Sequence, residues 1–384
     1  MSKLEDLIKE YCPDGVEYKK LKDVSIMQRG ISITKAQANY GYYPVVSGGR
    51  DPSFYCDRFN REGETITVAG SGAGAGFVQY WNSPIFANDC FTLKGKTQLN
   101  TKFLYYFLTT LQDKIYSLKK GGGVPHVHIS DIEDFSLPVP PLPVQEEIVR
   151  ILDSFTQLTA ELTAELTARK KQYEHYRETL MRFTDVPYIS ISELLPNIRN
   201  GFVGTVTSFF TDKENGIRYL EGTNIHNGVI SDNEVLYVTK DFHKKHIKNE
   251  LKSDDILMVQ SGHIGDCAVV GGKYKGSNCH ALIIMSNGGL CNSKFYVHYF
   301  HTVEGMKHLK PAITDGNLKH VLAGKMSFVK VPFPPIDQQN KIVKLLDKFE
   351  AFCNDISSGL PAEIEARQKQ YEYYRDSIFI FKEI

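Results

Sequence analysis

Residues 137–155, LPVPPLPVQEEIVRILDSF, return near the other end of the chain as residues 329–349, VKVPFPPIDQQNKIVKLLDKF. A second pair of stretches, ARKKQYEHYRETL at 168–180 and ARQKQYEYYRDSI at 366–378, matches in the same way. The first pair is offset by 194 positions, as between Pro138 and Pro332, and the second pair by 198. The chain is therefore a tandem duplication whose period of about two hundred residues is too long for a solenoid repeat but fits one globular domain plus one long helix.

Each copy predicts a long helix that starts directly after a proline cluster. Proline lacks the backbone N–H and disfavours helical geometry in the residue before it, so the prolines mark where each helix begins. Apolar residues then recur every three or four positions, and residues 158–169, LTAELTAELTAR, form a spacer of strong helix formers. In the second copy, Ser357, Ser358, Gly359, Leu360 and Pro361 predict a kink or a one-turn reset.

The two long helices need partners, because a lone amphipathic helix of this length cannot bury its apolar stripe. Two copies in one chain can bury each other as an antiparallel coiled coil. Two unrelated surface helices are the alternative, and the register of the match argues against them.

The segments before each helix are β-rich and follow one order. Short strands such as ETITVAG and HALIIMS come first, then a helix over 102–118 or 294–309, then a loop, LKKGGGVPHVHIS or LKPAITDGNLKHVLAG. The sequence thus predicts an α+β fold of two similar β-rich globular domains, separated by two long antiparallel coiled-coil helices and related by an internal pseudo-twofold repeat. The expected parts are a first domain with a short N-terminal helix (1–140), a first spacer helix (141–183), a second domain (184–335) and a second spacer helix (336–384).

Composition limits the class of protein. The 384 residues are 42% hydrophobic, enough for ordinary cores, and the charged start MSKLEDLIKEYC predicts no signal peptide. No apolar run approaches the roughly eighteen residues that a membrane span needs, and seven cysteines without a CxxC pair fit the reducing cytoplasm. The net charge is zero, so any DNA-binding face must come from the local arrangement of charge.

Three motifs with possible chemistry are better explained as structure. The glycine-rich residues 70–76, GSGAGAG, are followed by a β-rich run, whereas a phosphate-binding turn needs a helix there. Residues 51–54, DPSF, lack the second proline of the amino-methyltransferase signature, and the acids of residues 13–19, PDGVEYK, are too close for a nuclease site. Cys267, Cys279, His280 and Cys291 match no zinc spacing. We therefore expect no catalytic, cofactor-binding or metal-binding residues.

Loops that combine cations with amides, hydroxyls and glycines are the remaining candidates for a site. Arg, Asn and Gln read base edges, while Lys and backbone amides hold phosphates. A solvated surface charge remains the alternative for each residue alone, but both domains place such a loop just before the strand that leads into the long helix. The predicted DNA-binding residues are Arg29, Lys35, Ser47, Arg50, Lys119, Lys120, His126 and His128 in the first domain, and Asn224, His226, Lys244, Lys245, His263, Lys310, Asn317, Lys319 and His320 in the second.

A chain with two unlike DNA-recognition domains joined by repeated helices resembles the specificity subunit of Type I restriction-modification systems. The resemblance covers essentially the whole chain. Residues 141–153, PLPVQEEIVRILD, and 334–347, PPIDQQNKIVKLLD, are similar to the motif with which that family begins its long helices. The usual motif is Pro-Leu-x-Glu-Gln, and here Val144 and Asp337 precede the glutamines. The Thr-Ala-Glu-Leu repeats also resemble the family's spacer.

The resemblance implies a non-catalytic subunit with two target-recognition domains, each reading one half of a bipartite, asymmetric site in double-stranded DNA. It implies two modification subunits that methylate adenine, and restriction subunits bound through them. No cofactor is expected in this chain, because S-adenosylmethionine, ATP and Mg²⁺ would sit on those partners. Tyr173, Tyr176, Tyr371 and Tyr374 are predicted anchors for the modification subunits, or alternatively part of the coiled-coil packing.

Two other functions stay open from the residues alone. One is a non-enzymatic coiled-coil scaffold with two protein-binding modules, and the other is a methyltransferase that acts by itself. The target sequence and the gap length do not follow from single residues, because base reading depends on loop geometry.

Overall fold

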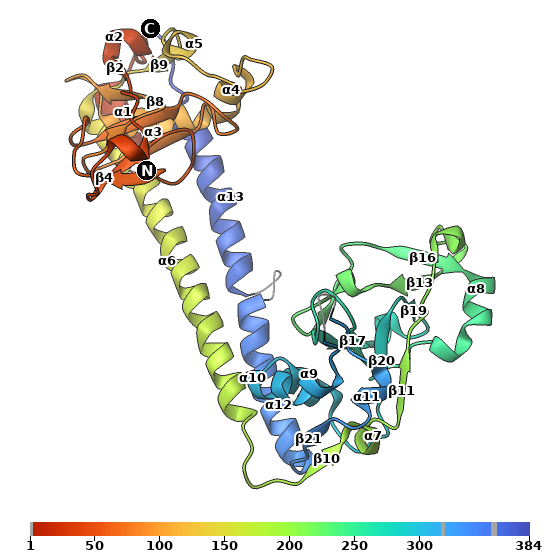
Figure 1. Cartoon of the computed structure of the whole chain (residues 1–384). Helices are drawn as coiled ribbons and strands as arrows, with labels where there is room; N and C mark the ends of the chain where they lie inside the picture. The colour runs from red at the N-terminus through yellow and green to blue at the C-terminus, as the bar shows by residue number, and fades with distance from the viewer. Residues whose placement is uncertain (1–2, 316–318, 355–358) are drawn as a thin grey trace. The chain divides into compact units, whose positions relative to one another are not determined.

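A computed structural model describes residues 3–315, 319–354 and 359–384 (Figure 1). The chain forms two compact units: unit 1 comprises Met1–Ala164 and Glu363–Ile384, and unit 2 comprises Glu165–Ala362. Helix α6 (Leu142–Leu180) is continuous and contributes its first part to unit 1 and its last part to unit 2. This division cuts α6 in its middle, so the four-part boundaries expected from the sequence stay a prediction.

Unit 1 is built on a four-stranded antiparallel sheet in the order β2-β8-β5-β6. A smaller sheet, β4-β3-β7, pairs β3 with β7 in parallel, and the pair β1-β9 joins the start of the domain to its end. The strands are β1 (Tyr18–Lys20), β2 (Ser25–Arg29), β3 (Tyr43–Val46), β4 (Phe54–Cys56), β5 (Thr65–Ala69), β6 (Val78–Trp81), β7 (Phe86–Ala87), β8 (Cys90–Gly95) and β9 (Ser136–Pro138).

Short helices cover this sheet and lead into α6. They are α1 (Lys3–Tyr11), α2 (Leu21–Val24), the 3₁₀ turn η1 (Lys35–Gln37), α3 (Thr101–Thr110), α4 (Gln112–Ser117) and α5 (Ile129–Ile132). All five residues of β5 are buried, and its Ile66 and Val68 belong to the same core as Phe103 and Leu104 of α3. The core of unit 1 therefore lies between the sheet and α3.

Unit 2 repeats this sheet in the order β11-β20-β17-β18, with β10-β21 in the place of β1-β9. Its second sheet, β12-β16-β13-β19, again contains one parallel pair, β13 with β19. The strands are β10 (Tyr188–Ser190), β11 (Asn197–Asn200), β12 (Phe210–Thr211), β13 (Gly216–Leu220), β14 (Ile225–His226), β15 (Val229–Ile230), β16 (Leu236–Thr239), β17 (Ile256–Val259), β18 (Cys267–Val269), β19 (Asn278–Cys279), β20 (Leu282–Ser286) and β21 (Lys330–Pro332).

The helices of unit 2 follow the same order, with additions. They are α7 (Ile191–Leu194), η2 (Thr207–Phe209), η3 (Gly222–Asn224), α8 (Lys240–Lys245), η4 (Ile247–Asn249), η5 (Gly272–Tyr274), α9 (Ser293–Phe300), α10 (Val303–Leu309), η6 (Lys310–Ala312), α11 (Ala323–Met326), α12 (Ile336–Asn354) and α13 (Leu360–Ile378), which belongs to unit 1 from Glu363 onward. The β14-β15 hairpin and α8 are additions to the common frame. The expected α+β fold with an internal repeat is confirmed.

The long helices pair in the same way within each unit. In unit 1 the start of α6 and the end of α13 lie side by side and share one core (Figure 1). The rings of Phe155 and Tyr374 stack with centroids 5.4 Å apart. In unit 2 the end of α6 packs on α12, and the rings of Tyr176 and Phe349 lie 5.2 Å apart. Because Phe155 and Phe349 are copies of each other, as are Tyr176 and Tyr374, the pair recurs with its partners exchanged. This exchange is the mark of an antiparallel pseudo-twofold repeat.

The breaks in the helices have local causes. The expected helix over 102–118 is divided at Leu111, and the expected helix over 294–309 is divided before Thr302, whose hydroxyl caps α10 by accepting from the Gly305 N–H. In the second spacer α12 ends at Asn354 and α13 begins at Leu360, so Leu360 and Pro361 of the expected interruption open a helix. Ser357 and Ser358 lie outside the described residues.

Along residues 3–315, 319–354 and 359–384, none of the helices has the length and apolar character required to cross a bilayer.

Candidate nucleic-acid interface

The glycine-rich residues 70–76 form the turn between β5 and β6, and strand β6 follows them directly. Gly72 and Gly76 adopt φ angles of 82° and 84°, which side chains rarely tolerate. A Cβ on Gly74 would lie 2.1 Å from the Gly48 carbonyl oxygen, so glycine is needed for the close approach of the two backbones. The predicted tight β-turn is confirmed.

Two other loops of unit 1 lie against this turn. A Cβ on Gly48 would lie 2.3 Å from the Ser71 carbonyl oxygen, which places the loop of Ser47 and Arg50 against the turn. The Lys119 Nζ donates to the Ala73 carbonyl at 3.0 Å. The loop that contains Lys119 is also joined to the turn by two backbone hydrogen bonds, from the Val127 N–H to the Gly70 carbonyl at 3.1 Å and from the Gly72 N–H to the Pro125 carbonyl at 3.0 Å.

A pocket of about 340 Å³ opens beside the turn and gathers three of the predicted residues, Arg29, His126 and His128. Arg29 is the last residue of β2, and the two histidines flank the buried Val127 and are themselves exposed. The histidine rings lie nearly parallel, with centroids 6.0 Å apart. The pocket therefore presents one guanidinium and two imidazoles.

The other polar groups of the pocket come from the segment before β8. Asn88 donates to the Ser47 Oγ at 3.0 Å and accepts from the Ile33 N–H at 3.0 Å, while Asp89 accepts from the Ser71 hydroxyl. Burial raises the pKa of the Cys90 thiol to about 12, so this thiol is neutral near pH 7. Asn88 and Asp89 were missed by sequence reasoning; their only signal is an Asn-Asp pair directly before a buried strand.

The remaining predicted cations of unit 1 differ in how firmly neighbouring groups hold their side chains. Lys35 is exposed in η1, and the Arg50 guanidinium lies 5.2 Å from the centroid of the Phe77 ring. Lys119 lies over the Tyr116 ring at 4.4 Å, and Lys120 forms an ion pair with Asp131 at 2.5 Å. Lys35 is thus the least constrained of these cations and Lys120 the most.

Unit 2 repeats the turn between β17 and β18 as residues 260–265, QSGHIG. The Gln260 carbonyl accepts from the Val321 N–H at 2.9 Å, as Gly70 accepts from Val127, and Gly262 and Gly265 have φ angles of 80° and 85°. Backbone hydrogen bonds place His320 in the position of His126, because Thr314 pairs with His320 as Lys120 pairs with His126. Both units therefore present a histidine at the same point.

Six further predicted residues of unit 2 fall into three groups. The ring of His226, on the β14-β15 hairpin, lies 5.9 Å from that of His263 on the turn. Lys310 and Lys319 line a pocket of about 590 Å³ beside α10. Lys244 and Lys245 are exposed at the end of α8, and Asn317 lies outside the described residues.

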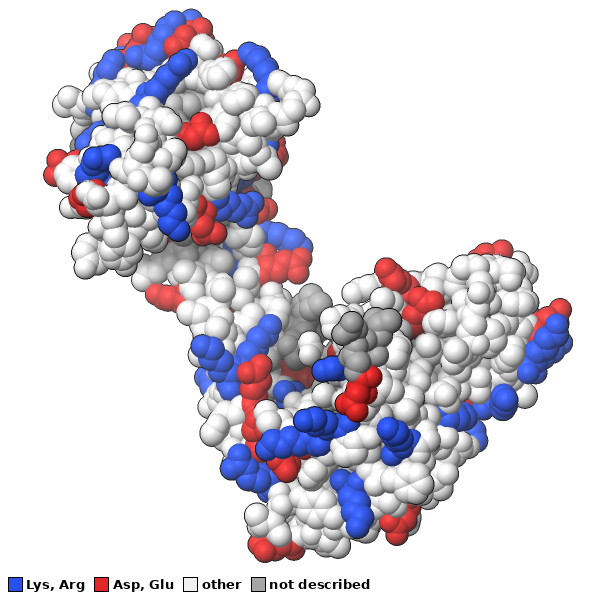
Figure 2. Space-filling model, in the orientation of Figure 1, with Lys and Arg blue, Asp and Glu red and all other residues white. Residues whose placement is uncertain are grey.

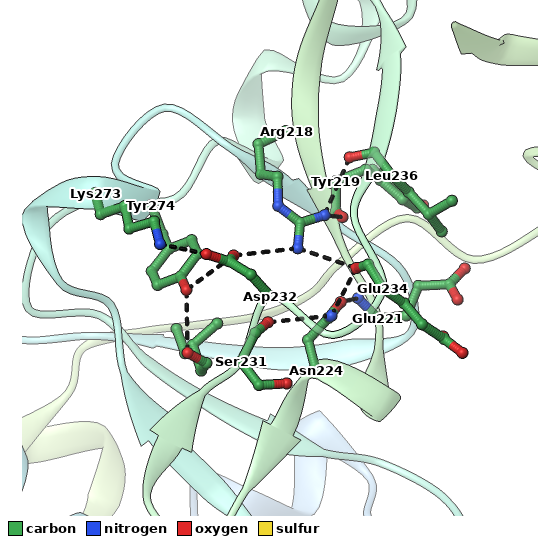
Figure 3. A network of polar contacts seen from close by, with 11 residues as sticks. Arg218, Tyr219, Glu221, Asn224, Ser231, Asp232, Glu234, Leu236, Lys273 and Tyr274 are labelled. Carbon is green, nitrogen blue, oxygen red and sulfur yellow. Dashed lines mark hydrogen bonds and ion pairs between the residues drawn. The ribbon is translucent and has the colours of Figure 1, made fainter. Parts of the chain in front are cut away.

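Asn224 differs from the other predicted residues, because it is 1% exposed and its amide is used within the domain. Its Nδ2 donates to the carbonyls of Ser231 at 3.3 Å and Glu234 at 2.9 Å, and its Oδ1 accepts from the Glu221 N–H at 2.9 Å (Figure 3). In the same network Arg218 donates to the Glu234 carbonyl. Asn224 therefore holds the loop in place, and we do not include it in the interface.

The four predicted anchor tyrosines divide into two pairs. Tyr173 is 8% exposed, its hydroxyl lies 3.3 Å from the His298 Nδ1, and Tyr371 packs on the core of unit 1. Tyr176 and Tyr374 are 38% and 43% exposed, although their rings also contact Phe349 and Phe155. The contact with a partner stays a prediction for all four.

His298, Asp347 and Glu350 form the one group among the described residues that could hold a metal ion. The Lys294 ammonium already lies 2.8 Å from the Asp347 carboxylate and 3.2 Å from that of Glu350. Burial opposes ionisation of Asp347, but the hydrogen bonds from His298 and Lys294 outweigh it and lower its pKa. The group is therefore an ion-pair network, and the equivalent Asp153 of unit 1 accepts from Tyr106 and Lys102.

The visible surface mixes charges of both signs. Figure 2 shows Lys and Arg side chains interspersed with Asp and Glu, in accord with the net charge of zero. An interface for nucleic acid on this chain must therefore use small clusters of cations such as those around the two turns.

Comparisons with known proteins agree with one another. The sequence model of the family described as "Type I restriction modification DNA specificity domain" matches residues 13–169 and again 183–366. A putative type I restriction enzyme specificity subunit of Haemophilus influenzae is 30% identical, over 95% of this chain and 96% of its own length. The EcoR124I/EcoR124II specificity subunit of Escherichia coli is 32% identical, over 73% of this chain and 70% of its own.

Solved structures show the same fold. The S subunit of the type I restriction-modification system of M. genitalium aligns over 96% of this chain and 97% of its own, with a TM-score of 0.60 and 16% identity. A chain from work on complex assembly and conformational transition of the type I system aligns over 96% and 98%, with a TM-score of 0.61 and 14% identity. The double match to the family model falls on the two repeats described above. The chain belongs to the family of type I restriction-modification DNA specificity proteins and is a specificity subunit of such a system.

Proposed function

We propose that each unit reads one half of a bipartite, asymmetric sequence in double-stranded DNA, and that the long helices set the gap between the halves. The observation that best supports this is the repeated frame with unlike loops. The turns after β5 and β17 hold the same position in their sheets, but one reads GSGAGAG and the other QSGHIG. Two domains that share one architecture but carry different loop side chains are suited to recognise two different half-sites.

In unit 1, the pocket beside the glycine-rich turn supplies the base-reading groups. Arg29 offers the paired donors that match the guanine edge, and the Asp89 carboxylate is suited to accept from the amine of cytosine. Lys35 and Arg50 hold phosphates on either side. The stacked rings of His126 and His128 add donors or acceptors according to their tautomers.

In unit 2, His226 and His263 take the corresponding place, with His320 on the late loop. Lys310 and Lys319 contact the phosphate backbone from one side of the turn, and Lys244 and Lys245 from α8. Because these side chains differ from those of unit 1, the two half-sites have different sequences.

The helices serve as a spacer and as a platform for partners. At about 1.5 Å per residue, the 39 residues of α6 extend for about 58 Å without interruption. The pseudo-twofold repeat presents two equivalent helical surfaces, which supports two modification subunits, with restriction subunits bound through them. Tyr176 and Tyr374, which are partly exposed copies, are the proposed anchors.

The chain itself carries out no chemistry in this proposal. S-adenosylmethionine, ATP and Mg²⁺ belong to the partner subunits, and the assembly works in the cytoplasm. Burial raises the pKa of the Cys279 and Cys291 thiols to about 12, as it does for Cys90, so these thiols are poor nucleophiles at neutral pH.

Binding of duplex DNA by the complex with modification subunits tests the proposal. We expect retention on heparin and an affinity for duplex that falls steeply with salt. A complex that binds other proteins through its β-rich units and does not bind duplex would favour the scaffold alternative. S-adenosylmethionine binding by the isolated chain would instead favour a methyltransferase.

A further inference from the structure

A second pocket in unit 2, of about 330 Å³, lies where the β14-β15 hairpin meets the long helices. Its walls come from α6, from α12 and from the hairpin, and the residues that matter here are Lys170, Glu174, Arg177, His226 and Glu350. In the sequence, Lys170 and Arg177 are simply part of a spacer helix. The structure places them beside a recognition hairpin.

The Arg177 guanidinium has the features of an anion-binding group. Its guanidinium carbon lies 5.2 Å from the centroid of the Tyr173 ring, and its Nε is buried without a hydrogen-bond partner among the described residues. The adjacent carboxylate, Glu178, is directed elsewhere and accepts from the Val303 N–H at 2.9 Å. A buried donor without a partner is costly, and an anion in the pocket would satisfy it.

The copy of this helix in unit 1 shows the opposite arrangement. Arg375, the copy of Arg177, forms an ion pair with Asp376 at 2.7 Å, and Gln368 stands in the place of Lys170. Lys170 is thus specific to unit 2, which is also where the hairpin is found, whereas the arginine is present in both units and differs in its partners.

The pocket contains two acids beside its two cations. The Lys294 ammonium, which lies 2.8 Å from the Asp347 carboxylate, also lies 3.2 Å from that of Glu350, so Glu174 is the acid of the pocket without a lysine partner in the described residues. Arginine presents two parallel donors to a phosphate, and a nearby lysine adds a point charge. The chemical class that fits is therefore a phosphate group.

The hairpin that closes the pocket is held firmly. Asn227 and Gly228 have φ angles of 49° and 86°, as a tight two-residue hairpin turn requires. The Asn227 N–H donates to Asp266, whose carboxylate also lies 2.8 Å from the His301 Nε2. The pocket is preformed rather than assembled around a mobile loop.

We propose that this pocket binds a backbone phosphate of the target DNA, so that Lys170 and Arg177 of the spacer helix are DNA-binding residues. The source of the phosphate is argued from continuity: His226 lines the pocket, and its ring lies 5.9 Å from that of His263 on the turn of the proposed interface. The inference rests on the proposed function and adds phosphate contacts on the helix to it. A phosphate contact carries no sequence information, so it fixes the position of the duplex rather than the bases read.

The test uses the complex with modification subunits and measures duplex binding against salt concentration. We expect Lys170→Ala and Arg177→Ala each to weaken binding about tenfold and to reduce the slope of log K against log salt by about 1. Glu174→Gln should strengthen binding, because it removes the opposing charge. Arg375→Ala, the matched control in unit 1, should leave the slope unchanged. Lys170 is exposed, so its variant keeps the fold even if Arg177→Ala does not.

Other outcomes would overturn the inference. Wild-type affinity and slope for Lys170→Ala and Arg177→Ala would do so, as would a change in the sequence that is methylated. A third outcome is that neither substitution affects duplex binding, while inorganic phosphate or ATP binds to the wild-type complex and not to the Lys170→Ala and Arg177→Ala variants. This outcome would assign the pocket to a free phosphate compound instead. A wild-type complex that binds no duplex would overturn the proposed function together with this inference, and is thereby distinguishable from failure of the pocket alone.

Discussion

The buried glutamines of the two units have two contacts in common, whereas the exposed loops around them differ. Gln145 accepts from the Asn100 N–H at 2.8 Å and Gln339 from the Asn292 N–H at 2.9 Å, and both glutamines are 0% exposed. Each also donates to the carbonyl of a proline before its helix, at 2.7 and 2.8 Å. By contrast, unit 2 adds a hairpin and α8 to the frame. The buried frame of strands and helices is therefore repeated in both units, while the loops on its surface differ.

The length of α6 gives the largest effect that would sharpen this comparison. Deleting Thr163–Leu166 removes one Thr-Ala-Glu-Leu unit and shortens the helix by about 6 Å, close to two base pairs at about 3.4 Å each. We expect the methylated site to keep both half-sites and to lose one or two base pairs from its gap. Methylome sequencing of cells that carry the deletion measures this, and an insertion of one unit is the matched control. Altered half-sites with an unchanged gap would refute it.

Removing the buried amides tests whether the frame is equivalent in the two units. Gln145→Ala leaves three backbone groups without their partner, and Gln339→Ala leaves two. We expect losses in the free energy of unfolding of about 3 and about 2 kcal/mol, measured by urea denaturation. The exposed Gln338→Ala should change it by less than about 0.5 kcal/mol. Equal stability of Gln145→Ala and the wild type would break the comparison.

Substitutions at the helix N-caps should have a smaller effect on stability, and an effect of equal size in the two units. The side chain of Asn100 accepts from the N–H groups of Lys102 and Phe103, and Asn292 does the same at the start of α9. Asn100→Ala and Asn292→Ala should each cost about 1 kcal/mol of unfolding free energy. Asp at either position keeps the accepting oxygen and should restore most of it. A loss confined to one unit would show that the frames differ.

The smallest effect concerns pH and belongs to unit 1 alone. Hydrogen bonds from Arg150, opposed by burial and supported by Lys3, hold the pKa of Glu147 at about 2 instead of 4.5, whereas its copy in unit 2 is Lys341. Because the folded pKa is the lower one, this stabilisation is complete above about pH 4.5 and is lost as the pH falls toward 2. Glu147→Gln should flatten the dependence of unfolding free energy on pH in that window. An unchanged slope would contradict the assignment.

The sequence predicts the frame well because the frame depends on periodicity. The proline clusters, the apolar stripes and the 194-residue offset indicate the helices and their pairing. The candidate site is predicted only in part. Arg29, His126 and His128 do meet in one pocket, but Asp89 was missed because its proximity depends on how distant segments pack.

Side-chain direction explains the remaining differences. Asn224 has the residue type of a base reader, yet its amide points into the domain and bonds with backbone groups. Lys170 and Arg177 read as spacer residues, and only the hairpin packed beside α6 gives them a pocket. Such outcomes depend on tertiary contacts that a linear pattern does not contain.

Exchange of residues 184–335 for the second domain of another specificity subunit tests the central claim most directly. Methylome sequencing of cells carrying the hybrid should show one half-site replaced completely, with the other half-site and the gap as in the wild type. A hybrid that changes both half-sites, or neither, would contradict the account of two separate readers on one repeated frame.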